Sequence, residues 1–186
     1  MNSLFQAGLE IQKYIQDNTW SFCFIGGLAV IRWGEIRMTQ DIDLCLLSGF
    51  GNEEFYIDRL LSSFNSRITD AKDFAIKNRV LLLSSSNGIS IDLSLSGINF
   101  EENMIARSTY FDFAPECSLF TCSAEDLIIL KAFSDRPQDW IDVEGIVYRQ
   151  KRKLDIDFIL KELKQLCIVK GDMNIIKKIK SILKKK

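Results

Sequence analysis

The sequence predicts an α+β fold, in which a mixed β-sheet with helices packed on one side is followed by an α-helical C-terminal section. Two observations carry this prediction. Short apolar runs typical of strands recur in the first two thirds of the chain, and from Ser123 onward the periodicity is helical without a convincing strand. We place a soft boundary near 116–122, which divides the chain into a sheet-bearing domain, 1–118, and a helical section, 119–186.

The first elements form a strand, a glycine turn and a helix. Helical spacing of apolar residues predicts an amphipathic helix over 3–17, and an aromatic-rich run predicts a buried strand over 20–25. Gly26-Gly27 interrupts this strand, helical potential resumes over 28–33, and Gly34 stands where a glycine would cap the helix C-terminus.

The next elements complete the predicted sheet. Asp41 to Leu47 reads as a strand, and a helix is expected over 52–64. The turn signal Ser86-Asn87-Gly88 predicts a hairpin. Its strands are expected over 79–84 and 89–95, followed by a shorter strand over 109–113. Helices are then predicted over 123–134, 138–149, 155–167 and 173–184.

Composition excludes several classes of protein. Of 186 residues 47% are hydrophobic, 26% are charged and only two are proline, which is unlike a disordered or collagen-like chain. The five cysteines are widely spaced and form no C-x-x-C pair, which argues against a disulfide scaffold or a structural zinc site and favours a reducing cytoplasm. Histidine is absent, so Ser-His and Cys-His dyads are excluded.

No membrane association is expected. The N-terminus lacks a basic region and does not read as a signal peptide. The most apolar run, Phe22 to Ile31, is too short to span a bilayer.

Charge is unevenly distributed. Residues 151–186 hold twelve Lys and Arg against four Asp and Glu, a net charge of +8, whereas residues 1–150 carry a net charge of −9. The basic tail fits contact with a polyanion, and a solvated helix face is the equal alternative. Ile175, Ile179 and Ile182 form an apolar stripe, so we expect the last helix to dock with its lysines outward.

Three aspartates form the candidate chemical centre. Asp41 and Asp43 are two residues apart on a predicted strand, so both carboxylates project from one face, and Asp92 is the only charge on the polar face of a second strand. If the strands are neighbours, the oxygen-only ligands fit Mg²⁺, and a pair of ions would suit in-line phosphoryl displacement. The alternative is that the D-x-D pair lies on an edge strand and serves solubility, with Asp92 facing solvent.

Glycines add to this pattern. Gly26-Gly27 stands where a strand passes into a helix, so bare backbone N–H groups can approach an anion there. The whole string from Gly26 to Leu44 is more specific than its parts. It resembles the polymerase-beta-like nucleotidyltransferase superfamily and is most similar to the AbiEii/AbiGii-type nucleotidyltransferase toxins. The matching positions are Gly26, Gly27, Ala29, Gly34, Arg37, Thr39, Asp41, Asp43 and Leu44.

A second stretch, 123–142, is similar to a helical segment of the same family. The resemblance implies that Lys131 binds nucleotide phosphates, with an exposed helix-surface lysine as the alternative. Arg136, Asp139 and Asp142 have helical spacing, for which a structural row of ion pairs is at least as good an interpretation as a catalytic one.

The resemblance implies a nucleotidyltransferase fold and a Mg²⁺-dependent enzyme, with Mn²⁺ as a substitute, that transfers a nucleoside monophosphate from an NTP to an acceptor hydroxyl. By the same analogy the acceptor is an RNA such as tRNA, or a protein, and the enzyme is a toxin with a cognate antitoxin. The implied roles are metal binding and catalysis by Asp41, Asp43 and Asp92, and nucleotide binding by Gly26, Gly27, Arg37, Thr39 and Lys131, with Lys131 also catalytic. Two alternatives remain open at this point: a non-catalytic nucleotide- or RNA-binding module of the same fold, and an aminoglycoside-like enzyme that modifies small molecules.

Overall fold

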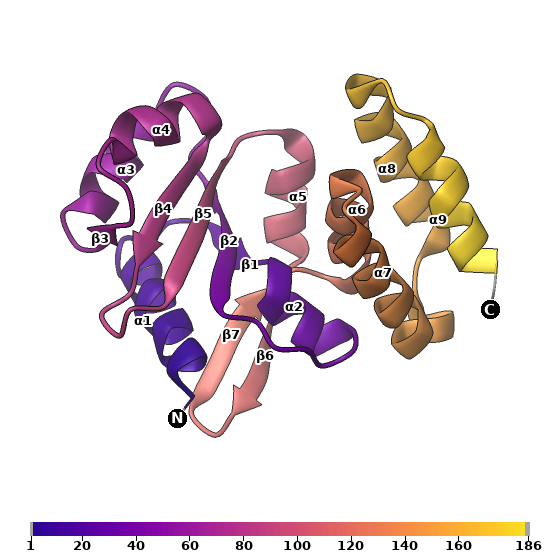
Figure 1. The fold of residues 1–186 in the computed structure, drawn as a ribbon, viewed down its shortest axis with the longest axis horizontal. Coiled ribbons are helices and arrows are strands. Elements are labelled where there is room, and N and C mark those ends of the chain that lie inside the picture. The colour runs from indigo at the N-terminus through magenta and orange to yellow at the C-terminus, as the bar shows by residue number, and fades with distance from the viewer. Residues whose placement is uncertain (1, 185–186) are drawn as a thin grey trace. The chain divides into compact units, whose positions relative to one another are not determined.

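A computed structural model describes residues 2–184 and divides the chain into two compact units (Figure 1). Of the described residues, the first unit comprises 2–28 and 38–122, and the second comprises 29–37 and 123–184. Helix α2 (Gly26–Trp33) contributes to both. The expected boundary between residues 118 and 119 falls inside a strand of the first unit.

The first unit contains a mixed seven-stranded sheet with the strand order β3-β4-β5-β2-β1-β7-β6. The pairs β2–β5 and β1–β7 are parallel and the other neighbours are antiparallel, which confirms the predicted mixed sheet. The strands are β1 (Phe22–Phe24), β2 (Asp41–Leu47), β3 (Asn65–Ser66), β4 (Val80–Ser84), β5 (Ser90–Ser96), β6 (Thr109–Ala114) and β7 (Cys117–Thr121).

One face of this sheet carries the hydrophobic core. Ile42, Leu44 and Leu46 of β2 are fully buried there, because alternate residues of a strand point to the same face. They belong to one cluster with the buried residues of α1 (Ser3–Asp17), α3 (Glu53–Leu61) and α4 (Ala71–Asn78). The other face carries Asp41, Asp43 and Cys45 of β2 together with Ser90, Asp92 and Ser94 of β5.

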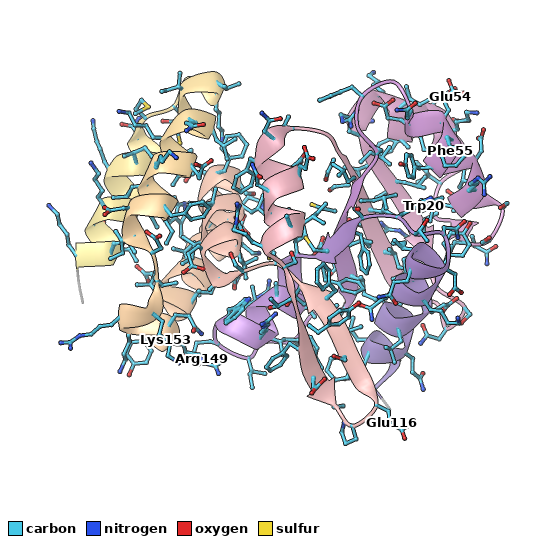
Figure 2. All side chains as sticks on the ribbon, turned by 180° about the vertical axis from the view of Figure 1, so that it is seen from behind. Trp20, Glu54, Phe55, Glu116, Arg149 and Lys153 are labelled. Atoms are coloured by element: carbon cyan, nitrogen blue, oxygen red, sulfur yellow. The ribbon has the colours of Figure 1, made fainter. Side chains whose placement is uncertain are left out.

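Trp20 lies between α1 and β1 and belongs to an aromatic cluster of this unit. Its ring lies edge-on to the rings of Tyr56 and Phe55 on α3, with centroids 4.9 and 6.1 Å apart (Figure 2). Such pairs add to the stability gained by burial. Trp20 therefore joins the end of α1 to α3.

Several sequence-based predictions for this unit are confirmed. The hairpin is present as β4 and β5, with Gly88 in its turn at φ +82°. The helix over 3–17 has the predicted bounds, and the strand over 20–25 is shorter at both ends.

Other elements were not predicted, namely β3, α4, α5 (Asn99–Arg107) and β7. Gly34 directly follows the last residue of α2, as the sequence predicted, but its backbone differs from the expected cap. It does not adopt the left-handed conformation of a capping glycine, and a Cβ there would lie 2.9 Å from Ile146 of the same unit. Gly34 therefore permits close packing and does not end the helix by its backbone conformation.

The second unit is helical, as predicted. Besides part of α2 it contains α6 (Ala124–Ser134), α7 (Pro137–Gln150), the short 3₁₀ helix η1 (Lys151–Lys153), α8 (Ile156–Lys170) and α9 (Asn174–Lys184). Ile175, Ile179 and Ile182 are buried, whereas Lys177, Lys178, Lys180 and Lys184 are exposed, so α9 docks as expected. Lys185 and Lys186 of the predicted basic tail lie outside the described residues.

Two further features bear on the environment of the protein. All five cysteines are buried free thiols. Among residues 2–184, no helix has the length and apolar character required to cross a bilayer.

Candidate active site

Strand register brings the three predicted aspartates to one face of the sheet. Asp43 of β2 lies directly beside Asp92 of the parallel strand β5, and Asp41 lies beside Ser90. Neighbours in register point to the same side, as do residues two apart on one strand. All three carboxylates therefore project from the face opposite Ile42 and Leu44. Because β2 lies between β5 and β1, the edge-strand alternative for the D-x-D pair is wrong.

Gly26 makes room for the carboxylate of Asp43. A Cβ built on Gly26 would lie 1.9 Å from Oδ2 and 2.6 Å from Cβ of Asp43, and Gly26 has φ +56°, which side-chain-bearing residues rarely adopt. The backbone N–H of Ile25 donates a hydrogen bond to the Asp43 carbonyl at 2.9 Å. The start of α2 is thus held against the second aspartate of the D-x-D pair.

Gly27 makes a similar approach to Thr39. A Cβ on Gly27 would lie 2.2 Å from Thr39 Oγ1. That hydroxyl donates to Asp41 Oδ1 at 2.9 Å. Thr39 therefore orients the carboxylate of Asp41, a contact that the sequence-based assignment to nucleotide binding did not include.

Asp92 pairs with an arginine that the sequence analysis did not identify. Arg67, which follows β3, directs Nη2 at Asp92 Oδ1. Both side chains are about one-third exposed, at 30% and 37%. Within residues 2–184, no three acidic or cysteine side chains converge tightly enough to hold a metal ion as they stand. The carboxylates share a face, and each has a different contact.

Arg37 and Lys131 meet in an ion-pair network of the second unit. Arg37 forms a two-pronged contact with Asp142, Nε to Oδ1 at 2.9 Å and Nη2 to Oδ2 at 3.1 Å. Lys131 Nζ lies 2.9 Å from both Asp139 and Asp142. Lys131 is buried, so the exposed helix-surface alternative is wrong.

Arg136 completes the network. Its Nε lies 2.6 Å from Asp139 Oδ2, three residues further on, so the structural interpretation of the row Arg136, Asp139 and Asp142 is supported by observed ion pairs. Because Asp139 and Asp142 are buried, the cations are required to compensate their charge.

The network shifts the acidity of both aspartates. Burial alone raises the pKa of Asp139, but hydrogen bonds from Arg136 and Lys131 outweigh it and lower that pKa from 3.8 to about 2. Burial also raises the pKa of Asp142, but hydrogen bonds from Arg37 and Lys131 outweigh this effect and lower that pKa below its ordinary value. Both groups therefore stay ionised over the physiological pH range.

The chemistry of the sheet face fits a hard divalent cation. Three carboxylates supply oxygen ligands, and the chain has no histidine. Mg²⁺ prefers such donors, commonly a few carboxylates completed by substrate phosphates. The bare Cα of Gly26 leaves the Asp43 carboxylate beside the start of a helix, where an anion is favoured.

The family model described as "Nucleotidyltransferase of unknown function (DUF6036)" matches residues 2–181. The chain belongs to this family. No curated protein matches this DUF6036 sequence.

Solved structures of nucleotidyltransferases share the fold. An antigenic nucleotidyltransferase-like protein from Paracoccidioides brasiliensis has 15% identity and a TM-score of 0.54, over 92% of this chain and 90% of that one. The lincosamide antibiotic adenylyltransferase LnuA, with lincomycin bound, has 12% identity and a TM-score of 0.53, over 78% and 98%.

A third solved structure is ANT(2")-Ia in complex with adenylyl-2"-tobramycin. It has 15% identity and a TM-score of 0.54, over 87% of the DUF6036 chain and 97% of its own. Because the sequence identities are low, these similarities establish a shared fold and nothing about the substrate.

We expect Gly26→Ala to destabilise the protein more than Gly49→Ala. Both glycines have positive φ, so both variants should lose roughly 1 kcal/mol to the left-handed conformation. Only at Gly26 would the new Cβ collide with Asp43, which should add about 1–3 kcal/mol. Urea unfolding of the two variants and the wild type measures the difference. Equal losses in the free energy of unfolding would show that Asp43 can move aside for the added methyl group.

Acid should weaken the second unit through Asp139. The pKa of Asp139 is lower in the folded chain than its ordinary 3.8, so its ionised form stabilises the fold above about pH 4. This contribution is lost as pH falls through about 2. Melting temperatures of the wild type and Asp139→Asn between pH 7 and pH 2 measure it. The variant should melt lower at pH 7 and converge with the wild type in acid, whereas parallel curves would contradict the assignment.

Proposed function

We propose that this DUF6036 protein transfers a nucleoside monophosphate from an NTP to an acceptor hydroxyl. The observation that carries the proposal is the register of β2 and β5, which sets Asp43 beside Asp92 with Asp41 on the same face. The fold and the family membership support the reaction class.

Asp41, Asp43 and Asp92 would hold Mg²⁺, with Mn²⁺ as a substitute. When bound, the ion would supply positive charge to the phosphate oxygens of the nucleotide. This ligand set is supported by the oxygen-only donors of the carboxylate face and by the position of Asp43 against Gly26.

Phosphate binding and proton transfer would be performed by residues of the chain. The first amide N–H groups of α2, at Gly26 and Gly27, would bind phosphate oxygens, because the first amides of a helix lack partners within it. The acceptor oxygen attacks the α-phosphorus while the bond to pyrophosphate breaks. The hydroxyl proton passes to a carboxylate, for which Asp92 is our candidate because the chain has no histidine.

Phosphate binding by Arg37 and Lys131 stays a prediction. Both side chains have carboxylate partners in the second unit, and these contacts would have to open or be shared for either cation to reach a phosphate. The proposal therefore rests on the carboxylate face rather than on these two residues.

An RNA is our first candidate acceptor. Lys177, Lys180 and Lys184 share one exposed side of α9 while its isoleucines are buried, and Lys153 of η1 extends into solvent (Figure 2). Such a row of cations suits a phosphate backbone. The motif resemblance also supports a toxin role with a cognate antitoxin in the cytoplasm, and the free thiols agree with a reducing compartment.

A small molecule is the second candidate acceptor. It is favoured by the fold shared with LnuA and ANT(2")-Ia, which are described with lincomycin and an adenylylated tobramycin. Incubation with each α-labelled NTP and, in parallel, total RNA, cell extract, lincosamides or aminoglycosides identifies the class that takes up label. Label in RNA alone would support the first candidate, and label in an antibiotic alone would support the second.

Asp43→Ala should reduce transfer by about a thousandfold or more, since a metal ligand contributes several kcal/mol to catalysis. Pyrophosphate release with each NTP measures the rate, and circular dichroism confirms the fold. Asp73→Ala, an exposed aspartate on α4, is the matched control and should retain the wild-type rate. Wild-type transfer by Asp43→Ala would exclude the mechanism. Nucleotide binding by the wild type without release would indicate the non-catalytic module.

Replacing Lys177, Lys180 and Lys184 together by Gln should weaken RNA binding and flatten its salt dependence. Each lysine that contacts a phosphate should contribute about 0.7–0.9 to the slope of log affinity against log salt. Filter binding at several salt concentrations measures the slope. The triple replacement of Lys13, Lys72 and Lys77 in the first unit is the control with equal charge change. If the two triple variants have the same slope, the lysines of α9 do not contact RNA and are simply solvated.

A further inference from the structure

Arg67 lies in the same row of the sheet as two of the three aspartates, Asp43 and Asp92. Its backbone N–H donates to the Leu82 carbonyl at 3.1 Å, Leu82 is the register partner of Asp92, and Asp92 is that of Asp43. Residues in one row across a sheet point to one face. The row Arg67–Leu82–Asp92–Asp43 therefore places a cation on the carboxylate face by backbone geometry.

The side-chain contact agrees with this placement. The guanidinium of Arg67 spans Leu82 and binds Asp92 Oδ1, one of the oxygens that a metal ion would need. A guanidinium has no acceptor atoms and remains charged at all ordinary pH values, so it occupies one oxygen of Asp92 and its charge repels a divalent cation at the same carboxylate. Arg67 and a metal ion are therefore competitors for Asp92.

The exposure of the pair indicates that it can exchange. With 30% and 37% of their side chains exposed, Arg67 and Asp92 interact through partly aqueous surroundings. Such pairs are weak compared with buried ones. The buried pair of Lys131 with Asp139, whose side chains are 9% and 2% exposed, is the contrasting case in this chain. Breaking the ion pair so that Asp92 can bind a metal ion would therefore cost little free energy.

We propose that Arg67 is a resident counter-ion that holds Asp92 until a divalent metal ion arrives with its nucleotide. Arg67 lowers the affinity of the carboxylate face for the metal alone. A triphosphate offers the displaced guanidinium new anionic partners, so the nucleotide strengthens metal binding. Arg67 acts through Asp92 and is a positioning residue. The inference rests on the metal-binding role in the proposed function.

The test is Mn²⁺ binding, measured by calorimetry and by the electron paramagnetic resonance of free Mn²⁺, without nucleotide. We expect Arg67→Ala to bind Mn²⁺ about fivefold more tightly than the wild type, the value of a partly exposed ion pair. Arg67→Gln, which keeps hydrogen-bond donors without charge, should be intermediate. A non-hydrolysable NTP analogue should reduce the difference in Mn²⁺ affinity between the wild type and Arg67→Ala.

Arg59→Ala is the matched control, because it removes an exposed arginine of the same unit that lies over the Phe55 ring. It should leave Mn²⁺ affinity unchanged. In an Asp92→Asn background, the Arg67→Ala change should have no further effect. Thermal melting of each variant checks that the fold is retained.

Equal or weaker Mn²⁺ binding by Arg67→Ala would overturn the inference, as would an equal gain in Arg59→Ala. The proposed function fails separately. If Asp92→Asn binds Mn²⁺ as tightly as the wild type, Asp92 is not a ligand and the proposed metal site is wrong. If Asp92→Asn weakens binding but Arg67→Ala does not strengthen it, only the role of Arg67 is lost.

Discussion

The register of β2 against β5, which sets three carboxylates on one sheet face, is the constraint on which the candidate site of the first unit depends. Each aspartate has a different neighbour: Asp43 lies against the bare Cα of Gly26, Asp41 accepts a hydrogen bond from Thr39, and Asp92 pairs with Arg67. None of these contacts supplies the charge of a divalent ion. The opposite face of the same strands is fully apolar, so the register that buries Ile42 and Leu44 also keeps the carboxylates together.

The two units use ion pairs in different ways. In the second unit, Asp139 and Asp142 are buried and each has more than one cationic or hydrogen-bonding partner, so removing one member leaves a charge uncompensated. In the first unit, the pair of Arg67 and Asp92 is half-buried and reaches water. The first arrangement suits a permanent support, and the second suits a contact that opens and closes.

Local patterns made much of the fold predictable. The alternation of Asp41 and Asp43 with Ile42, the Ser86-Asn87-Gly88 turn and the four C-terminal helices are all encoded within a few residues, and each is present. Helix α4 is short and weakly amphipathic, and β7 lies in the stretch taken as a boundary, so neither gave a clear signal.

The contacts that complete the site are of a different kind. Arg67 reaches Asp92 through a row of the sheet, and Arg37 reaches Asp142 from a segment more than a hundred residues earlier in the chain. No motif surrounds Arg67, because its partner is set by strand pairing and not by spacing. The basic tail is visible in the composition of the sequence, but the ion pairs of Lys131 with Asp139 and Asp142 depend on how the helices pack.

Parallel pairing of β2 with β5 has a consequence for the order of folding. Parallel neighbours cannot be joined by a tight turn, and here α3, β3, α4 and β4 all lie between them in the chain. Such non-local pairing forms slowly, since the intervening loop must be closed first. A growing polypeptide therefore acquires paired Asp43 and Asp92 only after β5 has been synthesised, and no shorter N-terminal fragment assembles the acidic centre.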